Sequence, residues 1–125
     1  MNINLFGSLY TIDVLLPKMK KSNKNIKILN ISSVLGLKGS PTSSPYCVSK
    51  FAMEGLTQCI AAELPNNIMI CSYDPGVVST DMLTNAMNST PQEAVNAGCI
   101  DVNDWGKLNY NFMVNILNRN DHNGK

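Results

Sequence analysis

The stretch from Ser33 to Lys50, SVLGLKGSPTSSPYCVSK, joins an apolar strand to a long helix and carries three chemically useful side chains. Ser33 ends the apolar run, while Tyr46 and Lys50 open the helix, four residues apart and therefore on one helical face. A cation about 4 Å from a phenol contributes about 1 kcal/mol in water and about 4 kcal/mol at an effective dielectric of about 20. Bringing a phenol from a pKa near 10 to about 7 needs about 4 kcal/mol. In a sheltered cleft, this pair predicts an acid–base centre.

The segments around this stretch predict a strand, a helix and a second strand. IKILNISS (26–33) is short, apolar and β-branched, and so is the run around Met69 to Cys71, which Pro75-Gly76 ends. The helix between them is expected from Tyr46 to about Leu64, ending at Pro65. Two such strands are typical of a parallel pair with a right-handed crossover. The predicted buried stripe of the helix is Phe51, Met53, Leu56, Ile60 and Leu64.

The flanking segments predict further helices. Apolar residues recur at spacings of three and four between residues 3 and 21, and Pro17 should kink or end that helix. Beyond Pro75-Gly76 we expect a short helix at 80–86, a polar loop, and a helix at 105–117. Four apolar residues of this region either line a pocket or pack in the ordinary way, and packing is the simpler interpretation. They are Met82, Leu83, Met87 and Trp105.

Two strands are too few for a complete parallel sheet. Such a sheet would have two bare edges and uncovered apolar faces. We therefore expect several further strands that these 125 residues do not encode. The chain is interpreted as part of a larger parallel α/β domain.

Composition excludes several functional classes. The 44% hydrophobic and 15% charged content is that of an ordinary globular chain, and the formal charge of +1 predicts neither nucleic acid nor an anionic membrane as partner. No apolar run is long enough to span a membrane and no secretory signal is visible, which predicts a cytoplasmic protein. The four cysteines are too far apart for a zinc site, so we expect no metal and reduced thiols, with Cys59 and Cys71 in the core. His122, the one histidine, is interpreted as an exposed tail residue.

The arrangement of these motifs resembles the short-chain dehydrogenase/reductase family. Tyr46-Cys-Val-Ser-Lys50 matches its Tyr-x-x-x-Lys, and Ser33, thirteen positions earlier, matches its catalytic serine. Asn4 resembles the asparagine of the catalytic tetrad, while Pro75-Gly76 and Thr80 resemble the nicotinamide-binding loop. The resemblance extends from about residue 2 to residue 82 and includes features of the sepiapterin-reductase-like carbonyl reductases.

The resemblance implies a Rossmann-like fold and a hydride transfer between NAD(P)(H) and a small ketone, aldehyde or alcohol. Tyr46 would be the general acid or base, Ser33 would hold the substrate oxygen, and Lys50 would lower the tyrosine pKa and hold the nicotinamide ribose. Asn4 would belong to the water chain that resupplies the proton. Pro75, Gly76, Val78 and Thr80 would bind the nicotinamide end of the cofactor.

The same resemblance sets expectations for the rest of the protein. NADP is the expected cofactor, with NAD as the alternative, although the family's T-G-x-x-x-G-x-G turn and its N-N-A-G strand end are absent from this sequence. The resemblance therefore implies that residues 1–125 form one partial domain, the second and catalytic half of a doubly wound Rossmann-like fold, with 81–125 as substrate lid and C-terminal region. Family members commonly form homo-oligomers through the helices that match Leu5 to Met19 and the helix of Tyr46.

Two other interpretations remain open at this point. Ser33, Tyr46, Lys50, Asn4 and Pro75-Gly76 each have an ordinary structural explanation when taken alone. The chain could therefore be a non-catalytic remnant that serves only as a binding or dimerisation module. A stand-alone flavodoxin-like ligand module is the weaker alternative, because no phosphate loop is visible.

Overall fold

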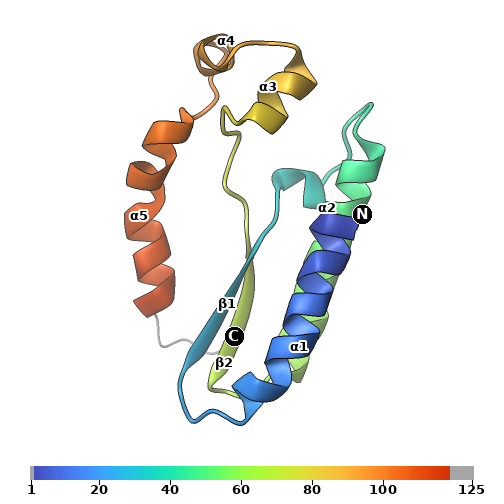
Figure 1. Cartoon of the computed structure of the whole chain (residues 1–125), viewed down its shortest axis with the longest axis vertical. Helices are drawn as coiled ribbons and strands as arrows, with labels where there is room; N and C mark the ends of the chain where they lie inside the picture. Colours follow the sequence, from blue (N-terminus) through green and yellow to red (C-terminus); the bar gives the residue numbers. More distant parts are fainter. Residues whose placement is uncertain (1, 119–125) are drawn as a thin grey trace. The chain divides into compact units, whose positions relative to one another are not determined.

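The computed structural model describes residues 2–118, which form two compact units, 2–74 and 75–118. Figure 1 shows the chain coloured along its sequence. The expected His122 tail position lies outside the described residues. The two units are described separately below.

The first unit holds the predicted strand, helix and second strand. Its elements are the π-helix η1 (Asn2–Gly7), α1 (Ser8–Lys20), β1 (Ile26–Ile31), the 3-10 turn η2 (Val34–Gly36), α2 (Ser44–Glu63) and β2 (Ile68–Tyr73). β1 and β2 pair in parallel, with Ile26 opposite Ile68 and Ile31 opposite Tyr73. The predicted parallel pair is confirmed, and among the described residues the sheet has two strands.

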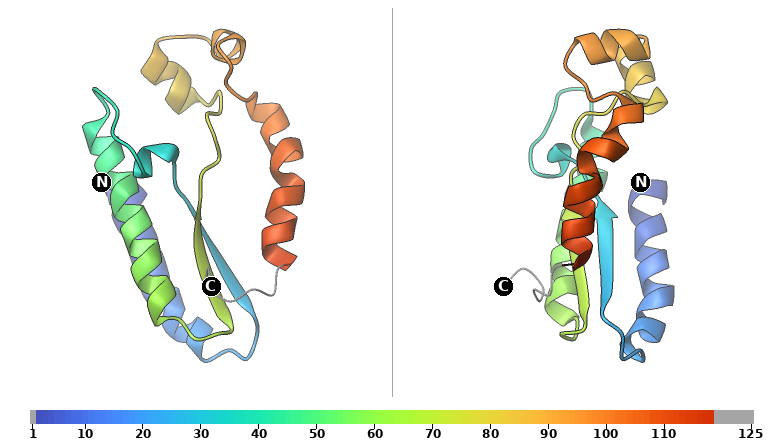
Figure 2. Two further views of the ribbon diagram at one scale, coloured as in Figure 1. Left: turned by 180° about the vertical axis from the view of Figure 1, so that it is seen from behind. Right: turned by 90° about the vertical axis from the view of Figure 1, so that its left-hand side faces the viewer.

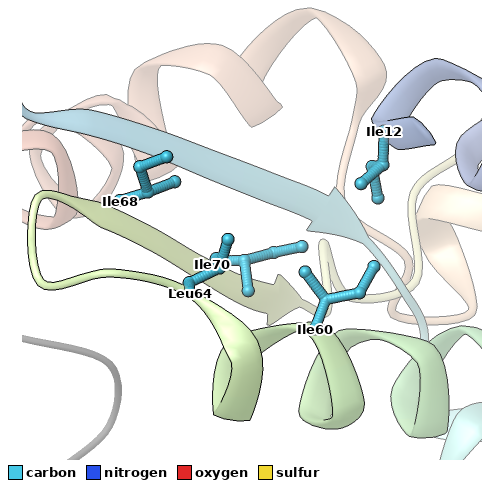
Figure 3. Packing of buried hydrophobic residues seen from close by; sticks show 5 residues of the cluster. All are labelled: Ile12, Ile60, Leu64, Ile68 and Ile70. Carbon is cyan, nitrogen blue, oxygen red and sulfur yellow. The ribbon is translucent and has the colours of Figure 1, made fainter. Parts of the chain in front are cut away.

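One face of this sheet carries the core. Figures 1 and 2 show α1 and α2 side by side against the strands. Ile26 pairs with Ile68 and Ile28 pairs with Ile70, and all four side chains point to the same face of the sheet. On this face they pack against residues of α1 and α2. Figure 3 shows the buried cluster between these elements. Its buried members are Ile12, Ile60, Leu64, Ile68 and Ile70.

The first helix differs from the prediction at its start. Its opening residues, Asn2–Gly7, are π-helical, and the α-helix begins only at Ser8. Of the two outcomes expected at Pro17, a kink or an end, the end does not occur, because Pro17 lies inside α1, which continues to Lys20. A proline removes one hydrogen bond to the preceding turn, and α1 continues despite that loss.

Two residues assigned to the core are on the surface. Phe51 is 46% exposed and Cys59 is also exposed, although both lie within α2. The apolar residues of α2 cover more of its circumference than the strands and α1 can bury. Met53, Ile60 and Leu64 are buried as predicted, while Cys71 is only half-buried. All four cysteines are free thiols.

The second unit consists of three helices. They are α3 (Asp81–Met87), α4 (Pro91–Asn96) and α5 (Val102–Asn118). The segment between α3 and α5, which was expected to be a polar loop, contains the helix α4. Thr90 caps it in a reciprocal capping box with Glu93, a signal that the sequence already carried as T-P-x-E.

The apolar residues of α3 do not behave as expected. Met82 is 66% exposed and Met87 is 47% exposed, so neither takes part in ordinary packing within the structure. Leu83 and Trp105 are half-buried. No helix within residues 2–118 has the length and apolar character needed to cross a bilayer.

Candidate active site

The first two turns of α2 bring Tyr46 and Lys50 together. The helix begins at Ser44 with Pro45 in its first turn, where a proline lacks no needed hydrogen bond. The Nζ of Lys50 lies 5.6 Å from the centroid of the Tyr46 ring. Both residues are half-buried. The predicted stacking on one helical face is therefore present, in a partly sheltered position where an ammonium acts strongly on an aromatic ring.

Lys50 is also anchored to the strand beside it. Its Nζ donates a hydrogen bond of 2.9 Å to the carbonyl oxygen of Ile31, the last residue of β1. Burial lowers the pKa of Lys50 from its ordinary value, and the carboxylates of Asp74 and Glu54 partly oppose this shift. Glu54 itself accepts a 2.6 Å hydrogen bond from the Ser72 hydroxyl of β2. The ammonium is thus fixed at the end of β1, and the Glu54 carboxylate that acts on it is bonded to β2.

Ser33 lies two residues after the end of β1 and caps the η2 turn. Its Oγ accepts a hydrogen bond of 3.2 Å from the Leu35 N–H. This bond uses one lone pair of the Ser33 hydroxyl, so its proton and its second lone pair are available for a further partner. The end of the turn packs closely on α2: a Cβ on the buried Gly36 would lie 2.9 Å from the Lys50 carbonyl oxygen. Only glycine therefore lets the Ser33 turn approach the Lys50 backbone this closely.

Asn4 reaches the same helical turn through a serine. The Asn4 side-chain amide donates a 3.3 Å hydrogen bond to the Ser49 Oγ, and Ser49 donates a 2.7 Å bond to the Tyr46 carbonyl oxygen. Asn4 lies in the π-helix η1, and such segments occur frequently at functional sites.

The remaining predicted residues lie at the start of the second unit. Gly76 has φ +77°, a left-handed conformation that favours glycine. Val78 forms a parallel bridge with Ile100, using the N–H of Ser79 and the carbonyl of Val77. Within residues 2–118 the Val78 N–H donates no hydrogen bond.

Thr80 and Pro75 have structural partners within this unit. The Thr80 side chain caps α3 by accepting from the Leu83 N–H at 3.5 Å. The indole N–H of Trp105 donates a 2.8 Å bond to the Pro75 carbonyl oxygen. The turn that contains Gly76 is therefore tied to α5 of its own unit.

Each unit offers groups that could bind polar ligand atoms. In the second unit the Val78 backbone N–H, which has no partner within residues 2–118, can donate to an amide oxygen. In the first unit the Lys50 ammonium can donate to hydroxyl groups. The sequence has no glycine-rich turn to bind a diphosphate. Among the described residues no group of three or more His, Cys, Asp or Glu is placed to hold a metal ion.

The structure brings some predicted residues together and adds others. Within the first unit, Asn4, Tyr46 and Lys50 are linked directly or through Ser49, and the turn after Ser33 packs on Lys50. Sequence reasoning did not assign Ser49 or Gly36 to the site, and it named Trp105 only as an apolar residue that packs or lines a pocket. The position of Ser49, three residues after Tyr46, was a usable signal, because a serine there can bond the earlier carbonyl. The partners of Gly36 and Trp105 are too distant in sequence to infer.

A parallel strand–helix–strand unit with polar residues after the strands is characteristic of nucleotide-dependent α/β enzymes. A sequence profile described as short chain dehydrogenase matches residues 1–91. The chain belongs to the short-chain dehydrogenase family, which confirms the predicted family and the Rossmann-like fold class.

Named relatives include characterised reductases. The chain is 38% identical over 93 residues to a diacetyl reductase [(S)-acetoin forming] of Staphylococcus aureus, covering 74% of this chain and 36% of the relative. It is 32% identical over 90 residues to an NADPH-dependent pterin aldehyde reductase of Arabidopsis thaliana, covering 72% and 37%. It therefore spans little more than a third of these relatives.

Solved structures give the same result. A short chain dehydrogenase of Shigella flexneri, crystallised in complex with NADP, superimposes with a TM-score of 0.65 at 30% identity. The match covers 73% of this chain and 38% of that structure. The architecture of the described residues is therefore that of part of a dehydrogenase domain.

Proposed function

We propose that this chain carries the catalytic part of an NADP-dependent reductase that acts on a small ketone or aldehyde, or on the alcohol in the reverse direction. NAD is the alternative cofactor. The observation that carries the proposal is the Tyr46–Lys50 pair on α2, anchored to the end of β1 just before Ser33. The NADP complex of the Shigella protein and the NADPH dependence of the Arabidopsis relative support the choice of cofactor.

In this proposal each site residue has a defined task. Tyr46 donates a proton to the oxygen of the reduced carbonyl, and Ser33 donates a hydrogen bond that fixes this oxygen. Lys50 holds its ammonium beside the phenol and binds the cofactor ribose, while Asn4 belongs to the proton supply. The bound dinucleotide supplies the hydride. Pro75 and Gly76 shape the loop from which Val78 and Thr80 hold the carboxamide.

The proposal is tested by the consumption of NADPH with a panel that includes diacetyl and aromatic aldehydes. The panel is run on the chain itself and on a fusion behind the amino-terminal part of the staphylococcal reductase. The proposal is supported if NADPH is consumed and this consumption is lost when Tyr46 is replaced. Comparison of the chain with the fusion shows whether the chain is active alone. If neither the chain nor the fusion consumes NADPH, the proposal is contradicted.

A second candidate is a non-catalytic dimerisation module. Apolar side chains on the surface of α1 and α2 favour it: Tyr10, Val14 and Val48 are each at least half exposed. Pairing of two copies through these helices, in a cytoplasmic setting, would bury them. Sedimentation of the chain and of the Val14→Asp variant measures whether two copies pair through this face. A module without enzymatic function dimerises through this face, and neither the chain nor the fusion consumes NADPH.

A further inference from the structure

Ser49 occupies a central position that none of the proposed catalytic steps uses. It is 1% exposed and lies next to Lys50 on α2. Its hydroxyl accepts from the Asn4 amide at 3.3 Å and donates to the Tyr46 carbonyl at 2.7 Å. One oxygen atom thus links the π-helical segment η1 to the turn that carries the proposed acid.

The π-helical segment needs such an external partner. π-helical turns are rare and less favourable than α-helical ones, so contacts outside the helix must compensate. The hydrogen bond from Asn4 to Ser49 is a long-range, part-buried contact between η1 and α2. Without the Ser49 oxygen, the part-buried Asn4 amide has lost this acceptor. The cost of that unpaired donor disfavours the observed packing of η1 on α2.

Another side of the same helical turn is fixed separately. Consecutive residues on an α-helix point about 100° apart, so Ser49 and Lys50 face different neighbours. Ser49 faces Asn4, while Lys50 reaches the Ile31 carbonyl at the end of β1. The start of α2 is therefore held on two sides.

We propose that Ser49 is a positioning residue that holds η1 against the start of α2, and thereby fixes Tyr46 and Lys50 relative to the end of β1. This inference rests on the proposed function, because it assigns a purpose to that geometry. Ser49 itself contacts neither substrate nor cofactor. It acts through Asn4 and through the backbone of Tyr46.

The test compares Ser49→Ala with Ser44→Ala, an exposed serine in the first turn of the same helix. Misplacement of a catalytic group by about 1 Å costs up to about a hundredfold in rate. We expect Ser49→Ala to lower kcat at least about tenfold with KM within about twofold, and Ser44→Ala to change neither. Amide hydrogen exchange in residues 3–7 should become faster only in Ser49→Ala.

A double variant separates positioning from general destabilisation. If Ser49 acts through Asn4, Asn4→Ala should lower kcat at least as far as Ser49→Ala does, and the double variant should lose no more than Asn4→Ala alone. Independent effects would multiply, which would overturn the proposed linkage. If Ser49→Ala does not fold, Ser49→Cys keeps the side-chain size with a weaker hydrogen bond and is judged by the same criteria.

The two readouts distinguish this inference from the proposed function. A wild-type chain and fusion without turnover contradict the proposed function, and hydrogen exchange alone then decides the role of Ser49. Faster exchange in residues 3–7 for Ser49→Ala alone supports it. Unchanged exchange, or unchanged kcat in an active protein, overturns it.

Discussion

The Nζ of Lys50 donates a 2.9 Å hydrogen bond to the carbonyl oxygen of Ile31, the last residue of β1. This bond joins the helix that carries Tyr46 to the strand end that leads into Ser33. The two residues are 19 positions apart, and the intervening loop and η2 bring them back together. The relationship defines the centre on which the predictions below depend.

Tyr46→Phe should reduce NADPH-dependent turnover by about 10²–10⁴-fold, because it removes the proton donor and leaves the ring in place. The circular dichroism spectrum should not change. Tyr10→Phe, an exposed tyrosine of α1, is the matched control and should retain activity. Turnover by Tyr46→Phe at the wild-type rate would exclude the proposed mechanism.

Gly36→Ala should destabilise the chain by about 1–3 kcal/mol, because the new Cβ would lie 2.9 Å from the Lys50 carbonyl oxygen. The free energy of unfolding in urea measures this. Gly39→Ala is the control, since a Cβ there meets nothing within 4 Å. Equal effects of the two substitutions would show that η2 does not pack on α2 as described.

Lys50→Met should alter how stability depends on pH. Burial lowers the pKa of Lys50 from 10.5 in the folded chain, so the unfolded chain binds more protons between the lowered pKa and 10.5. The free energy of unfolding of the wild type, relative to Lys50→Met, should therefore rise as pH increases through this window.

Urea unfolding of both proteins between about pH 7 and about pH 10.5 measures this difference. Burial also raises the pKa of Cys71 and of Tyr73, but both groups are present in both proteins, so their effects cancel in the difference. Lys18→Met, at an exposed position of α1, controls for the loss of a charge. If the free energy of unfolding of the wild type relative to Lys50→Met fell as pH increased, the lowered pKa of Lys50 and the burial that causes it would be contradicted.

Thr57→Val should cost about 1–3 kcal/mol, because it removes the acceptor of the buried Asn30 amide. Asn30 donates to the Thr57 Oγ1 at 2.8 Å, and Thr57 donates to the Met53 carbonyl at 2.8 Å. Thr11 makes the same bond along its helix, to the Gly7 carbonyl at 2.8 Å, but is exposed. Thr11→Val should therefore change the free energy of unfolding by about 0.5 kcal/mol or less.

Trp105→Phe should weaken NADPH binding by about fivefold, since it removes the hydrogen bond of about 1 kcal/mol to the Pro75 carbonyl. The Kd from NADPH fluorescence measures this effect, on the fusion if the chain alone binds weakly. Tyr110→Phe, an exposed aromatic on the same helix, should leave the Kd unchanged. Equal Kd values for all three proteins would show that this bond does not shape the cofactor loop.

The parallel strand–helix–strand unit and the pairing of Tyr46 with Lys50 could both be predicted from the amino-acid sequence. Both follow from local spacing: apolar periodicity sets the elements, and a separation of four residues sets the shared face. The capping box of α4 was equally local, although it was not used to predict that helix.

Which surfaces of those elements are covered, and which distant groups meet, depends on the packing of the folded chain. Phe51 and Cys59 fit the helical pattern, yet they are exposed, because burial depends on where the neighbouring elements lie. The bonds from Asn4 to Ser49 and from Trp105 to Pro75 join residues 45 and 30 positions apart. Such contacts arise from packing between elements, and no local spacing in a single sequence encodes them.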